Sequence, residues 1–171
     1  IIDWALECHS PVIGRWRVES PRSDLLLWRA WSAKDIALSL TELCLPFFQL
    51  RPIEFYEEKQ PGKHLQMLNK RSKSLSEFVA LTILAASAQN GTKAGASTLQ
   101  EWLEVALELE KLRNYHMMFA VQCGLSKHQV DRVLKDFKVK KKWVKFKKHL
   151  DEFFDPTTRM GPAIEAMKDM S

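Results

Sequence analysis

The hydrophobic residues of this chain recur mostly at spacings of three and four, which is the period of one face of an α-helix. The first such series is Ile36, Leu40, Leu43 and Phe47. Ser32, which precedes the series, is a typical N-cap residue, and Asp35 adds an acid to the first turn. Pro46 is expected to kink or end this helix near its last turn, and Pro52 suits the start of a short helix after it.

A second helix is predicted over about residues 64–89, after a break at Gln60-Pro61-Gly62. Its centre, residues 78–86, is apolar on almost every side, which is typical of a helix buried on several faces. Small residues at 90–96 predict a loop. The pattern Ser97-Thr98-Leu99-Gln100 is that of a capping box and predicts the start of the next helix.

Hydrophobic residues in the C-terminal half follow the same helical spacing of three and four. The segment Asn114-Tyr115-His116 interrupts it, and an apolar helix then resumes toward Gly124, which suits a helix end in the left-handed conformation. A second capping box, Ser126-Lys127-His128-Gln129, predicts one last long helix with aromatic residues on one side and lysines on the other. A break at Asp155-Pro156-Thr157 follows. We find no strand pattern, and the sequence therefore predicts an all-α fold.

The length and composition fit one folded domain. The chain has 171 residues, of which 46% are hydrophobic and 27% charged, as in ordinary globular proteins. We assign a helical domain to residues 32–171. Residues 1–31, which contain two prolines and four tryptophans, are assigned to an N-terminal segment packed on this domain or preceding it. Because the chain begins without a methionine or a signal-peptide pattern, we expect it to be part of a longer polypeptide.

The motifs that usually indicate catalysis are missing from the sequence. No glycine-rich phosphate loop occurs, and the five histidines lie far apart without metal-binding spacing. We therefore expect no metal, no cofactor and no catalytic residue with bond chemistry. The three cysteines, Cys8, Cys44 and Cys123, form no disulfide framework, which indicates a reducing compartment such as the cytoplasm. These absences favour a function carried by a surface.

The positive charge is concentrated in one segment. The net charge is +5, but residues 127–148 hold ten Lys or Arg against two Asp, a local charge of +8 that leaves −3 for the rest. Three interpretations compete: a solvated helix face, a contact with an anionic membrane, and binding to nucleic acid. Trp143 and Phe146 share a stripe with Leu150 and Phe153, so packing explains them, and nucleic acid is the least favoured partner. The candidate contact residues are Lys138, Lys140, Lys141, Lys142 and Lys145.

Several blocks of the sequence resemble, in order and spacing, the catalytic domain of Ras guanine-nucleotide exchange factors (RasGEF). Residues 75–84 are similar to the segment in which a polar residue and an aromatic precede a buried helix. Residues 99–125 resemble the block with an asparagine-rich run and a Gly-Leu corner, here Leu112-Arg113-Asn114-Tyr115-His116 and Gly124-Leu125. Residues 130–137 resemble the following block, and residues 35–55 the family's opening helix and proline turn.

The resemblance implies a multi-helix domain that binds a Ras-family small GTPase and promotes release of GDP. Such domains grip switch II and act as GTPase regulators without bond chemistry, by stabilising the nucleotide-free state. Carried over by position, the candidate GTPase-binding residues are Asn69, Ser72, Lys73, Arg113, Asn114, Tyr115 and His116. For three of them a structural role is the alternative: Asn114 as a helix cap, Tyr115 as a core residue and His116 as a solvated linker residue.

Two departures from the family pattern favour an alternative. Arg113 stands where the family has an asparagine, and the segment expected after Ser171 would carry the catalytic hairpin that opens switch I. We therefore expect a C-terminally incomplete or divergent RasGEF-like domain. The leading interpretation is an exchange factor within a larger cytoplasmic signalling protein, with the other domains as partners and recruitment to a membrane. The alternative is a non-exchanging scaffold for protein–protein or membrane contact.

Overall fold

The computed structural model describes residues 30–45, 62–134 and 139–168, and these residues form a helical assembly without a strand. The α-helices are α2 (Ala33–Cys44), α4 (Lys63–Lys111), α5 (Tyr115–Leu125), α6 (His128–Leu134), α7 (Lys141–Phe153) and α8 (Gly161–Lys168), with the 3-10 helix η3 (Pro156–Thr158) before α8. The predicted all-α fold is confirmed. The predictions for residues 1–29, for the short helix after Pro52, and for Phe47 and Lys138 lie outside the described residues.

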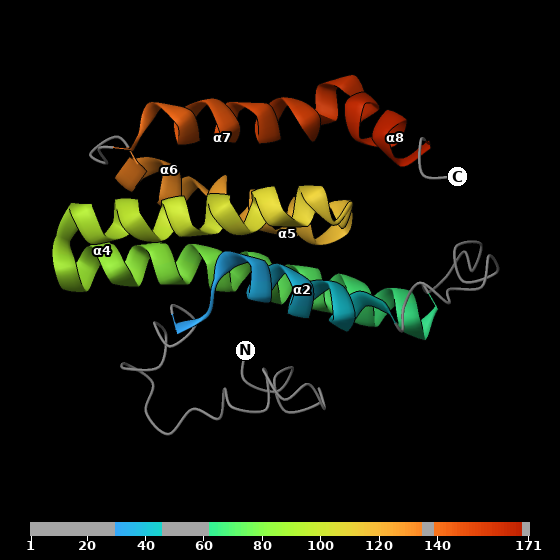
Figure 1. The fold of residues 1–171 in the computed structure, drawn as a ribbon, viewed down its shortest axis with the longest axis horizontal. Coiled ribbons are helices and arrows are strands. Elements are labelled where there is room, and N and C mark those ends of the chain that lie inside the picture. Colours follow the sequence, from blue (N-terminus) through green and yellow to red (C-terminus); the bar gives the residue numbers. More distant parts are fainter. Residues whose placement is uncertain (1–29, 46–61, 135–138, 169–171) are drawn as a thin grey trace.

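The longest element, α4, is a helical hairpin. Its two arms, residues 63–90 and 92–111, run antiparallel and meet at Gly91, whose φ of 80° and ψ of 177° lie outside the helical region (Figure 1). A Cβ at Gly91 would meet nothing within 4 Å, so the turn requires glycine for its backbone conformation and not for space. The arms face each other and supply the largest share of the buried hydrophobic residues.

The predicted loop at 90–96 is wrong, because only Gly91 leaves the helix. The small residues after it belong to the second arm, where Gly95 and Ala96 are buried, so their size reflects packing rather than a loop. The capping box at Ser97 is wrong for the same reason. Ser97 lies inside the arm, and its hydroxyl donates to Glu101 Oε1 at 3.2 Å.

The core between the arms confirms that residues 78–86 are buried on several sides. Val79, Ile83 and Ala86 have no exposed surface. The Phe78 ring packs edge-on against the Trp102 ring with centroids 6.0 Å apart, and Trp102 Nε1 donates to Thr82 Oγ1 at 2.9 Å. The buried indole and hydroxyl therefore satisfy each other inside an otherwise apolar layer.

Helix α2 covers the hairpin with Ile36, Ala37 and Leu40, as its spacing predicts. The N-cap at Ser32 is confirmed, because its Oγ accepts from the Asp35 backbone N–H at 3.2 Å. On the other side of the hairpin, α7 and α8 follow one another along the top of Figure 1. The apolar stripe of α7 faces inward: Trp143 and Leu150 are buried, and Phe146 and Phe153 pack against the core.

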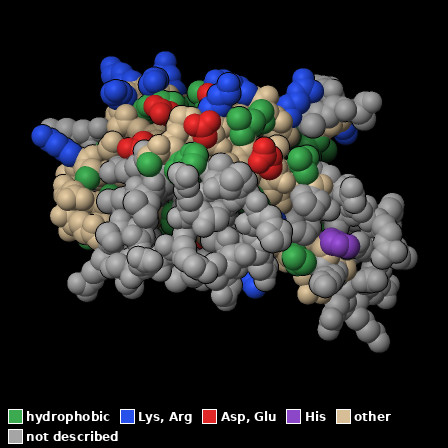
Figure 2. All heavy atoms as spheres, turned by 60° about the horizontal axis from the view of Figure 1, so that its bottom comes forward, with side chains coloured by type: hydrophobic (Ala, Val, Ile, Leu, Met, Phe, Trp, Pro, Cys, Tyr) green, Lys and Arg blue, Asp and Glu red, His purple; other side chains and the backbone are tan. Residues whose placement is uncertain are grey.

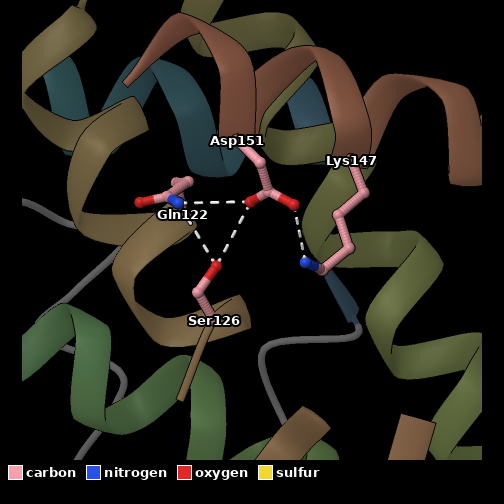
Figure 3. Close-up of polar contacts among 4 residues, drawn as sticks. All are labelled: Gln122, Ser126, Lys147 and Asp151. Carbon is pink, nitrogen blue, oxygen red and sulfur yellow. Dashed lines mark hydrogen bonds and ion pairs between the residues drawn. The ribbon is translucent and has the colours of Figure 1, made fainter. Parts of the chain in front are cut away.

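The structure corrects the predictions for the segment between α5 and α7. The one long helix expected there is two helices, because Lys140 has extended backbone and precedes α7 as its N-cap residue. The capping-box serine, Ser126, instead takes part in a network between α5 and α7 (Figure 3). Its hydroxyl donates to Asp151 Oδ1 at 3.3 Å, while Gln122 Nε2 donates to the same oxygen at 3.2 Å and Lys147 Nζ contacts Asp151 Oδ2 at 3.0 Å.

Gly124 marks the closest approach of α5 to α4. It is buried and lies within α5, and its φ is not positive, so the predicted left-handed helix end at this residue is wrong. A Cβ at this position would lie 2.7 Å from both the Ser76 carbonyl oxygen and Val79 Cβ. Glycine is required here because the two helices touch through their backbones.

Replacing Gly124 by alanine should therefore lower the free energy of unfolding by about 1–3 kcal/mol, because the backbone of α4 must move away. Urea denaturation followed by circular dichroism measures this change. Gly161→Ala is the matched control: a Cβ there meets nothing within 4 Å, so it should be neutral or stabilise α8 by up to about 1 kcal/mol. Equal effects of the two substitutions would contradict this account of the α4–α5 contact.

None of the helices in the described part of the chain combines the length and the apolar character needed to cross a bilayer.

Candidate functional site

The chain reverses direction between α4 and α5, and most of the predicted site residues lie at this corner. Arg113 has a left-handed backbone, with φ 56°, and its N–H donates to the Glu110 carbonyl at 2.9 Å. The next N–H, that of Asn114, donates to the Leu109 carbonyl at 2.9 Å. These two bonds close the end of α4 in the way that glycine or asparagine usually closes a helix. The Arg113 side chain is exposed at the corner.

Asn114 holds the corner from inside. Its side-chain Oδ1 accepts from the Met117 N–H at 3.1 Å, which caps α5, and its Nδ2 donates to Thr41 Oγ1 of α2 at 3.0 Å. The residue is only 3% exposed. The structure thus shows the capping role that the sequence allowed, and the Asn114 amide lies beneath the surface.

Ser72 and His116, which are 44 residues apart in the sequence, meet beside this corner. Ser72 Oγ and His116 Nε2 are 2.5 Å apart, which joins the first arm of α4 to the first turn of α5. Burial lowers the pKa of His116 below its usual value, and a hydrogen bond to the Leu68 backbone acts in the opposite direction. The ring is therefore neutral at pH 7. In the tautomer that donates its Nδ1 proton to the Leu68 backbone, Nε2 accepts the Ser72 hydroxyl proton.

The remaining predicted residues surround this contact. Asn69 and Lys73 lie three residues before and one residue after Ser72 on the first arm, and both side chains are exposed. Tyr115 is half-buried, and its ring packs against the Phe153 ring with centroids 5.5 Å apart. We call the surface formed by Asn69, Ser72, Lys73, Arg113 and His116 the corner surface.

Two residues that support the corner, Arg71 and Thr41, could not be predicted from a sequence pattern. Arg71 reaches across from α4, and its guanidinium donates to the Leu43 carbonyl at 2.8 Å, near the C-terminus of α2, where a positive charge is favourable. Thr41 accepts the Asn114 amide and donates to the Ala37 carbonyl at 2.8 Å. The contacts of Arg71 with Leu43 and of Thr41 with Asn114 follow no helical period or local motif, because each joins residues that are distant in the sequence.

The thiols near the core are not nucleophiles. Burial raises the pKa of the Cys44 thiol to about 11, although a hydrogen bond with Asn114 acts in the opposite direction. Burial also raises the pKa of Cys123. Both thiols are therefore protonated at neutral pH and behave as small apolar groups. Within the ranges that the structure describes, no three His, Cys, Asp or Glu side chains gather in a way that could hold a metal ion.

The pKa of His116 makes the stability of this corner depend on pH. Since the folded-state pKa lies below the unfolded value, the unfolded chain binds more protons once the pH falls below about 6.5, and the contribution of the neutral ring is then lost. The stability advantage of wild type over His116→Gln should therefore shrink between about pH 7.5 and about pH 5.5 in urea denaturation.

Ser72→Ala is the control, because it removes the hydrogen bond but leaves a titrating ring in the same place. It should keep the pH dependence of wild type. An advantage over His116→Gln that stays constant or grows as the pH falls would show that the ring is not held neutral by burial.

The chain matches a known protein family over most of its length. The family model of the RasGEF domain matches residues 35–171, which is well over half of the chain. No curated protein matches it. The matched region includes α2, both arms of α4, the corner surface and α5 to α8.

Proposed function

The chain belongs to the RasGEF domain family, and we propose that it acts as a guanine-nucleotide exchange factor for a Ras-family GTPase, which docks on the corner surface. The observation that supports this location is the contact between Ser72 and His116. It joins two segments that the resemblance selects independently, one on α4 and one at the start of α5.

The corner surface has the properties of a preformed docking site. Its backbone is fixed by the buried Asn114 amide and by the closed end of α4, so little conformational entropy remains to be lost on binding. Its exposed groups are the Asn69 amide and the positive charges of Lys73 and Arg113. A partner that presents carboxylates or carbonyl oxygens to this surface would be complementary to it.

Exchange requires no bond chemistry from this surface. An exchange factor lowers the barrier to nucleotide release by binding the nucleotide-free GTPase more tightly than the GDP-bound form. Each tenfold difference in affinity between the two forms corresponds to about 1.4 kcal/mol.

Arg113 favours a second candidate function, a scaffold that binds a partner without exchange. It projects a long cationic side chain from a left-handed position at the centre of the corner. There it would select an acidic segment over the apolar and aromatic switch segment that the family resemblance implies. A scaffold would bind its partner equally well in all nucleotide states.

Release of fluorescent GDP from Ras, Rap and Ral proteins separates the two functions. The full-length protein should accelerate release from at least one of them. The double substitution Lys73→Glu and Arg113→Glu should lower the catalytic efficiency by about tenfold or more, because like charges across an interface repel.

Lys34→Glu with Lys93→Glu is the matched control, since both lysines are exposed and neither belongs to the corner surface. This control should exchange like wild type. Binding with no acceleration for any of these GTPases would leave the scaffold as the function, and equal losses in both double variants would place the docking site elsewhere.

A further inference from the structure

Helix α7 presents a basic face, and acidic groups in the described residues pair with only part of it. Lys147 pairs with Asp151 at 3.0 Å and Lys148 with Glu152 at 3.3 Å, both near the C-terminal end of the helix. Lys140, Lys141 and Lys145 are exposed and form no ion pair within the described residues. Figure 2 shows Lys and Arg side chains gathered along one edge of the molecule.

This arrangement is unfavourable for the helix by itself. The first turn of α7 holds no acidic residue, and lysines stand where the helix dipole is positive. Lys141, Lys145 and Lys148 also follow one another at spacings of four and three, where like charges repel. Helix α7 is held in place by its buried side, through Trp143 and Leu150. An external anion that binds the outer side would relieve the repulsion between the lysines there.

An apolar residue lies in the middle of the basic face. Val144 is 56% exposed and lies one helical turn from Lys140 and Lys141 on one side and from Lys147 and Lys148 on the other. A lysine-rich helix face is attracted to anionic lipid headgroups, and an exposed aliphatic residue at its centre can enter the boundary between headgroups and acyl chains. The lysine stems can extend along apolar groups while their charges reach phosphates.

The aromatic residues of α7 argue against nucleic acid as the occupant. Trp143 is 5% exposed, and its ring packs edge-on against that of Phe146 with centroids 6.2 Å apart. Lys142 lies over the Trp143 ring, with its Nζ 4.2 Å from the centroid. The buried Trp143 ring is therefore not available for a base to stack on. The positive charges form a row along a helix, which suits an array of headgroups.

We propose that the basic face of α7, Lys140 to Lys148, binds the surface of a membrane that contains anionic phospholipids. The helix begins at the end of the molecule where α4 turns, whereas the corner surface lies toward the other end of the hairpin (Figure 1). The two surfaces use different residues, so this proposal does not depend on the exchange activity.

Co-sedimentation with vesicles tests the proposal. The purified chain should bind vesicles of phosphatidylcholine mixed with phosphatidylserine, and should not bind phosphatidylcholine alone. The triple substitution Lys140→Gln, Lys141→Gln and Lys145→Gln should weaken this binding by roughly a hundredfold, and Lys145→Gln alone by about fivefold. Raising the salt concentration should weaken the binding of wild type.

Lys34→Gln, Lys70→Gln and Lys93→Gln together form the matched control, because these lysines are exposed, lie outside α7 and carry the same total charge. This control should bind like wild type, and circular dichroism should show that all variants are folded. Equal weakening by the two triple substitutions, equal binding to phosphatidylcholine alone, or binding to a DNA duplex as tight as to the mixed vesicles would each overturn the proposal.

Discussion

The buried side chain of Asn114 is the interaction on which the candidate site depends. One amide caps α5 through Met117 and ties the corner to α2 through Thr41. A buried amide that loses such partners costs about 1–3 kcal/mol, so these two contacts favour the observed path of the chain at the corner. The left-handed backbone of Arg113 is maintained by this constraint. As a result, the residues exposed on either side of Asn114 have a fixed position relative to α4.

The corner surface and the basic face of α7 differ in how the rest of the structure supports them. The corner surface is supported from within, by the contact of Ser72 with His116 and by the capped ends of α4 and α5. On the outer face of α7, lysines surround Val144, and the ion pairs described there join residues of the same helix, Lys147 with Asp151 and Lys148 with Glu152. The first surface is suited to recognise the shape of a protein partner, and the second to respond to the charge density of an anionic layer. The same helical core carries both.

The hydrophobic period predicted the helices, because burial of one face decides where a helix lies. Predictions from the sequence were wrong where small residues could be explained either by a loop or helix end or by close packing. Ala96 looked like part of a loop but packs inside α4, and Gly124 looked like a helix end but allows two backbones to touch. The interruption at residues 114–116 located the corner. The contacts of Asn114 with Thr41 and of Ser72 with His116 were beyond sequence reasoning, since they join positions 73 and 44 residues apart and leave no local pattern.

Native-state hydrogen exchange of Asn114→Ala, compared with Asn90→Ala at an exposed position, tests the central role of this side chain most directly. The account predicts that the amide protons of Met117 and Met118 lose protection selectively in Asn114→Ala, with a global loss of stability of about 1–3 kcal/mol, while Asn90→Ala exchanges like wild type. Unchanged protection at Met117 and Met118 in Asn114→Ala would contradict it, because the corner would then be held by something other than the Asn114 amide.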